Sequence, residues 1–60
     1  MTYGQRIKQG REQAGLTQEA LAEAVGVSRQ AVSKWEADRA RPTADKLAYL
    51  SERLAIPAEE

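Results

Sequence analysis

Hydrophobic residues recur along this chain at helical spacing, in segments separated by glycine, proline or small polar residues. Leu21 and Val25 lie about one helical turn apart, and Leu47, Leu50 and Leu54 follow at i, i+3 and i+7. Such spacing places the apolar side chains of each segment on one face of an amphipathic α-helix. The pattern therefore predicts an all-α domain.

Capping residues set the ends of the predicted helices. Thr17, Ser28 and Thr43 are suitable N-caps, and Gly26 stands where the helix before it should end. Pro57 fits the first position of another helix. We expect one domain over the whole chain, with helices at residues 3–14, 18–25, 29–37 and 44–54 and the start of a fifth from 57.

The most informative segment is 17–36, which reads as two short helices joined by a tight turn. Gly26 occupies the usual place for a left-handed residue at the end of the first helix. Ala22, four positions earlier, is small enough for two helices to cross at a steep angle. This is the sequence signature of a helix-turn-helix, a unit that lays its second helix in the DNA major groove.

One face of the second helix is almost free of apolar side chains. Arg29, Gln30, Ser33 and Lys34 fall within an arc of roughly 140°, and Trp35 faces the opposite side. Arginine and lysine suit guanine, glutamine suits adenine, and serine suits several bases. We therefore predict that these four polar residues read base edges. The alternative is an ordinary solvated face.

Several short motifs along the chain match one family: Arg6-Ile7, Arg11, Gly15-Leu16-Thr17-Gln18, Leu21-Ala22, Val25-Gly26-Val27-Ser28, Arg29-Gln30, Val32-Ser33-Lys34-Trp35-Glu36, Pro42 and Leu47/Leu50/Leu54. With these motifs, residues 3–56 resemble the phage-repressor and Cro-type helix-turn-helix domains, also called the xenobiotic-response-element (XRE) family. The resemblance implies a compact, lambda-repressor-like bundle of four to five helices. It further implies a homodimer on double-stranded DNA with a pseudo-palindromic operator.

Phosphate contacts are expected on both sides of the base-reading face. Thr17 and Gln18 begin the first helix of the motif, where backbone N–H groups form an anion site. Ser28 begins the second helix, and Arg39 and Arg41 follow it in a loop. The alternatives are that Gln18 is an ordinary surface residue and that the two arginines are ordinary loop charges.

Other matched residues have structural roles by resemblance. Arg11 and Glu36 occupy positions that typically form a partly buried salt bridge between the first and third helices. Trp35 could be an exposed stacking platform, but its place on the inner arc favours the core. Gly26 permits the tight turn between the two helices of the motif, and the small Ala22 permits their close crossing.

Three departures from the family pattern are visible. Gly10 stands where a large apolar residue is usual, so either Trp35 fills the space or the domain is less stable. Ala55 replaces a glycine after the helix at 44–54, where a left-handed residue is often needed. Ala37-Asp38 replaces a polar-glycine pair, which affects the loop's phosphate contacts. The sequence stops at Glu60, before the apolar residues of a fifth helix that family members usually have, so we expect either a fragment of a longer regulator or a small domain whose dimer forms in another way.

Composition limits the chemistry available. Sixty residues bury only about 60% of the surface that the unfolded chain exposes, so the core is thin. Cysteine and histidine are absent, which argues against an enzyme, a metal site or a cofactor. Nine basic and nine acidic residues cancel, which argues against DNA binding. Residues 29–41, however, carry four basic and two acidic side chains, a net charge of +2.

We therefore expect a sequence-specific, DNA-binding transcriptional regulator, with repression the commoner outcome in the family. The alternatives are a DNA-binding antitoxin of a toxin–antitoxin pair and a protein-interaction module of the same fold. No small-molecule ligand is evident. No apolar run suggests a membrane span or signal peptide. We expect a cytoplasmic location, bacterial or phage-type, in association with the nucleoid.

Overall fold

Four α-helices make up residues 1–56, the part of the chain that this computed structural model describes. The helices are α1 (Tyr3–Gln13), α2 (Gln18–Val25), α3 (Arg29–Glu36) and α4 (Ala44–Leu54). The predicted all-α class is confirmed, and α1 and α3 each end one residue earlier than expected. The expected helix from residue 57 lies outside the described residues.

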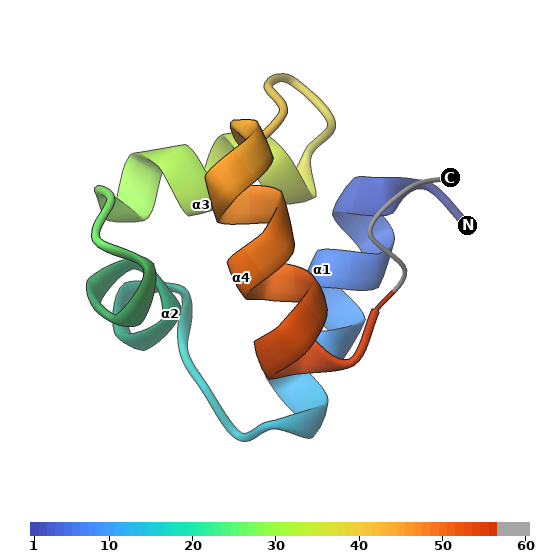
Figure 1. Cartoon of the computed structure of the whole chain (residues 1–60), viewed down its shortest axis with the longest axis vertical. Coiled ribbons are helices and arrows are strands. Elements are labelled where there is room, and N and C mark those ends of the chain that lie inside the picture. Colours follow the sequence, from blue (N-terminus) through green and yellow to red (C-terminus); the bar gives the residue numbers. More distant parts are fainter. Residues whose placement is uncertain (57–60) are drawn as a thin grey trace.

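The helices pack around one core (Figure 1). α3 packs against both α1 and α2, and α4 packs against the same two helices from another side. Trp35 is 5% exposed and lies in this core, and Ala22 is also buried in it. The full set of buried hydrophobic residues is Tyr3, Ile7, Leu21, Ala22, Val25, Val32, Trp35, Leu50 and Leu54.

The helix N-termini are capped by hydroxyl side chains at three of the four helices. Thr2, Thr17 and Ser28 each accept a hydrogen bond from the backbone N–H three residues ahead. Thr43 occupies the N-cap position of α4 but makes no such bond. Its hydroxyl donates instead to the Asp45 carboxylate, and this hydrogen bond lowers the pKa of Asp45. Thr43 is therefore the N-cap residue of α4, as expected, but its side chain does not make the capping hydrogen bond to the backbone.

Gly10 allows α1 and the end of α4 to approach closely. A Cβ atom at Gly10 would lie 3.0 Å from Leu54 Cβ and 3.4 Å from Ile56 Cγ2. The space left by the missing side chain is thus occupied by Leu54 and Ile56. Of the two alternatives for Gly10, the one in which Trp35 fills the space is wrong, because Leu54 and Ile56 occupy it; the alternative of a less stable domain stays a prediction.

Ala55 ends α4 in the left-handed conformation, with φ 55° and ψ 40°. This conformation costs a residue with a Cβ atom roughly 1–2 kcal/mol, whereas glycine adopts it readily. We expect Ala55→Gly to raise the free energy of unfolding by about 0.5–1 kcal/mol, after the added freedom of the unfolded chain is deducted. Urea denaturation measures the change. Ala48→Gly, at an exposed site inside α4, is the control and should cost about 1 kcal/mol. A loss of stability in Ala55→Gly would contradict the expectation.

Candidate nucleic-acid interface

The four predicted base-reading residues share one exposed face of α3. Arg29, Gln30, Ser33 and Lys34 are all exposed, while Val32 and Trp35 on the opposite face are buried. In the described part of the chain, the side chains of Gln30, Ser33 and Lys34 make no hydrogen bond or ion pair. Their donors and acceptors therefore remain available for an external ligand.

A tight turn holds α3 against α2. Gly26 has φ 89°, the left-handed conformation expected of it, and its N–H donates to the carbonyl of Ala22. The N–H of Val27 donates to the same carbonyl at 2.9 Å. Lys46 reaches from α4 and donates to the carbonyl of Val25 at 3.3 Å. These bonds use the Ala22 and Val25 carbonyls at the end of α2, and α3 begins at Arg29, three residues beyond Gly26.

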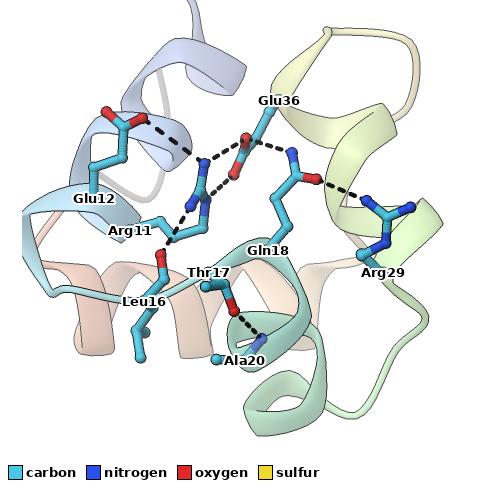
Figure 2. A network of polar contacts seen from close by, with 8 residues as sticks. All are labelled: Arg11, Glu12, Leu16, Thr17, Gln18, Ala20, Arg29 and Glu36. Atoms are coloured by element: carbon cyan, nitrogen blue, oxygen red, sulfur yellow. Dashed lines mark hydrogen bonds and ion pairs between the residues drawn. The ribbon is translucent and has the colours of Figure 1, made fainter.

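A largely buried ion pair links α1 to the end of α3 (Figure 2). Arg11 Nε lies 2.7 Å from Glu36 Oε2, and the side chains are only 11% and 5% exposed. A second guanidinium nitrogen donates to Glu36 Oε1 at 3.3 Å, and a third donates to the Leu16 carbonyl at 2.8 Å. The hydrogen bond to Glu36 raises the pKa of Arg11 above its usual value, although burial opposes this change. The pair that the resemblance implied is present.

Gln18 joins this ion pair to the exposed face of α3 (Figure 2). Its Nε2 donates to Glu36 Oε1 at 2.9 Å, and its Oε1 accepts from a guanidinium nitrogen of Arg29 at 3.4 Å. A carboxylate only accepts and a guanidinium only donates, so the amide has one favourable orientation. In the described part of the chain, the backbone N–H groups of Gln18 and Glu19 at the start of α2 make no hydrogen bond. The Thr17 hydroxyl caps α2 at Ala20 N.

Of the two acidic residues of segment 29–41, only Glu36 has a buried side chain, whereas Asp38 is exposed but bonded to the start of α1. Glu36 is buried against α1, and the carboxylate of Asp38 accepts hydrogen bonds from the first turn of that helix. Lys34, Arg39 and Arg41 are exposed. The exposed surface of this segment is therefore more basic than its net charge of +2 indicates. The Arg41 guanidinium also lies over the Tyr3 ring, 5.4 Å from the ring centroid.

Sequence reasoning missed two residues near this surface, Gly4 and Asp38. A Cβ atom at Gly4 would overlap the Trp35 carbonyl oxygen and lie 2.9 Å from that of Glu36. Gly4 therefore lets the start of α1 touch the end of α3. A glycine in the first turn of a predicted helix is a signal for such close approach. No local pattern reveals the contacts of Asp38, because its partners are more than thirty residues away.

A family model described as "Helix-turn-helix" matches residues 7–60. The chain belongs to the XRE-type helix-turn-helix family. The XRE-type domain is 37% identical over 60 residues to the HTH-type transcriptional activator BcrR of Enterococcus faecalis, covering 100% of this chain and 29% of BcrR. It is 41% identical over 56 residues to an uncharacterized transcriptional regulator in the ATPase CF(0) region of Rhodospirillum rubrum, covering 93% and 52%.

A third relative of the XRE-type domain is the SPbeta prophage-derived regulator YonR of Bacillus subtilis, 32% identical over 57 residues, or 95% of this chain and 53% of YonR. The chain spans about half or less of the length of these relatives. No solved structure matches it. Among residues 1–56, no helix combines the length and apolar character that a membrane crossing requires.

Proposed function

We propose that this XRE-type domain binds double-stranded DNA sequence-specifically as the DNA-reading part of a transcriptional regulator. The observation that carries the proposal is the exposed face of α3, where Arg29, Gln30, Ser33 and Lys34 lie together. A helix of this size fits the major groove, and these side chains match the hydrogen-bonding groups of base edges. The inward orientation of Glu36 removes the nearest α3 carboxylate from that face.

Phosphate contacts on either side of α3 would position it. The N–H groups and the Gln18 side chain at the start of α2 would hold one phosphate strand, next to Thr17. Ser28 would contact the backbone where α3 enters the groove. Arg39 and Arg41, both exposed, would hold the backbone beyond its other end. These contacts set the orientation of the protein on the duplex, and the α3 contacts supply sequence preference.

We further propose that two copies act as a two-fold dimer on a pseudo-palindromic operator. The equivalent α3 helices would then lie about one DNA turn apart, roughly 34 Å. Repression is the regulatory outcome that the family resemblance favours. One relative is named an activator, and the same DNA-reading face serves either outcome. The position of the operator relative to the promoter would decide between them.

Gln30→Ala tests direct base reading, because the exposed Gln30 side chain makes no hydrogen bond within residues 1–56 that the substitution would remove. We expect the substitution to remove the preference at one position of each half-site, at a cost of about 1–3 kcal/mol. The measurement is selection of a binding site from randomised duplexes, followed by competition with single-base variants. Gln9→Ala, the same change at an exposed site on α1, should leave affinity and preference unchanged. Equal weakening on every sequence would make Gln30 a phosphate contact instead.

A further inference from the structure

Asp38 occupies the left-handed backbone position that glycine fills after α1 and α2 and that Ala55 fills after α4. Gly15 and Gly26 end α1 and α2 with φ 75° and 89°, and Asp38 follows α3 with φ 61°. Its N–H donates to the Trp35 carbonyl at 3.1 Å, and the next N–H donates to the Lys34 carbonyl at 2.9 Å. This pair of crossing bonds is the Schellman ending of a helix. Aspartate tolerates the left-handed conformation less well than glycine. We therefore expect its carboxylate to make contacts that glycine cannot make.

The Asp38 carboxylate binds the first turn of α1 with both oxygens. Oδ2 accepts from the Thr2 hydroxyl at 2.7 Å, and Oδ1 accepts from the Gly4 N–H at 3.1 Å. The Thr2 hydroxyl oxygen itself accepts from the Gln5 N–H, so its proton is directed toward Asp38. A carboxylate at a helix N-terminus is further stabilised by the helix dipole. We call these contacts between Asp38, Thr2 and Gly4 the α1–loop clamp.

The clamp holds the loop that carries the two phosphate-contacting arginines. It fixes the loop at Asp38, immediately before Arg39. The other end is fixed by buried Pro42 and by Arg41, whose guanidinium lies 5.4 Å from the centroid of the Tyr3 ring. Tyr3 lies between the two clamped residues of α1. Asp38 and Arg41, near the two ends of the short loop, therefore both contact residues at the start of α1.

We propose that Asp38 is a positioning residue for DNA binding, which fixes the α3–α4 loop on α1 so that Arg39 and Arg41 are preorganised for the phosphate backbone. This inference rests on the proposed function. It gives an acidic residue a favourable role beside DNA, where its charge alone opposes binding. Removal of the Asp38 charge alone would tighten DNA binding, whereas loss of its positioning role would weaken it, so the direction of the change in affinity distinguishes the two effects.

Asp38→Gly keeps the left-handed backbone and removes the carboxylate. If only charge mattered, losing a negative group near phosphates would tighten binding. We expect instead about five-fold weaker binding, because a released loop loses conformational entropy when it is ordered on the DNA. Asp38→Asn is the matched control, since it also removes the charge but keeps an acceptor for the Gly4 N–H and tolerates the left-handed conformation. It should bind at least as tightly as the unmodified chain.

The measurement is fluorescence anisotropy of a labelled random-sequence duplex, titrated with each variant at several salt concentrations. Arg39→Ala with Arg41→Ala serves as reference and should reduce the salt slope by about two. The Nε–H signal of Arg41 reports the loop directly, because the Tyr3 ring shifts it in the clamped state. In Asp38→Gly this signal should move toward the value of a free arginine.

Each outcome has one meaning. Weaker binding by folded Asp38→Gly together with a displaced Arg41 signal supports the positioning role. Equal or tighter binding by Asp38→Gly overturns it, as does a stability loss in urea with unchanged affinity of the folded protein. An unchanged salt slope in the arginine variant also overturns it, because the loop then makes no phosphate contact. Failure of the unmodified chain to bind the duplex would instead overturn the proposed function.

Discussion

Glu36→Ala is expected to lower the free energy of unfolding by about 3 kcal/mol, because it leaves the Arg11 guanidinium buried without its partner. The Arg11 side chain is 11% exposed, so water compensates for little of the lost interaction. The substitution also removes the acceptor for the Gln18 amide. A domain of this size has roughly 3–9 kcal/mol of stability in total, so the variant should melt at least ten degrees lower. Thermal and urea denaturation followed by circular dichroism measure the loss.

The matched control for Glu36 is Glu12→Ala. Glu12 Oε2 also lies near Arg11, 4.0 Å from a guanidinium nitrogen, but its side chain is 58% exposed. An exposed pair contributes little, and we expect this variant to stay within about 0.5 kcal/mol of the unmodified chain. Equal effects of the two substitutions would show that burial of the Arg11–Glu36 pair does not determine its contribution.

Gly4→Ala is the second substitution with a large expected effect. The added Cβ atom would overlap the Trp35 carbonyl oxygen and lie 2.7 Å from Asp38 Oδ1. The obstructing carbonyl belongs to the backbone of α3, so α1 must move as a whole, and overpacking of this kind costs about 1–3 kcal/mol. The higher helix propensity of alanine offsets less than about 1 kcal/mol of this. We expect a net loss near 2 kcal/mol in urea denaturation.

Gly10→Ala is the comparison for Gly4→Ala, because it makes the same change in the same helix. There the new Cβ atom would meet Leu54 Cβ at 3.0 Å and the Leu54 carbonyl oxygen at 3.3 Å, contacts that a small shift of α4 relieves. The gain in helix propensity and the tight contact then nearly cancel, within about 1 kcal/mol. If Gly4→Ala proves as mild as Gly10→Ala, the close approach of α1 and α3 is not a constraint on the fold.

The features predictable from the sequence are those with local causes. Helical spacing and capping residues located α1 to α4 within one residue, and the helical wheel placed Trp35 in the core and Lys34 outside. The left-handed turn at Gly26 was visible because glycine has a specific use there. The Arg11–Glu36 pair became predictable only through the family resemblance. All of these depend on the periodicity of one segment or on a motif.

The features that escaped prediction depend on how helices approach one another. Asp38 was identified only as a departure from the family pattern, because its contacts with α1 arise from the crossing of α1 and α3. The neighbours of Gly10 were predicted wrongly, since the path of the chain after α4 decides them. The bridging position of Gln18 required the distance from Glu36 to Arg29 across two helices. None of these distances is encoded in the spacing of residues along the chain.

The central claim, that the α3 face binds DNA, is tested most directly by amide chemical-shift titration of the isotope-labelled chain with a random-sequence duplex at low and high salt. Non-specific affinities of about 10⁻⁴–10⁻⁶ M are measurable in this way, even for a monomer. We expect shifts at Thr17–Gln18, Ser28–Lys34 and Arg39–Arg41 that diminish as salt is raised. Unchanged amide signals at these positions in the folded domain would contradict DNA binding through α3.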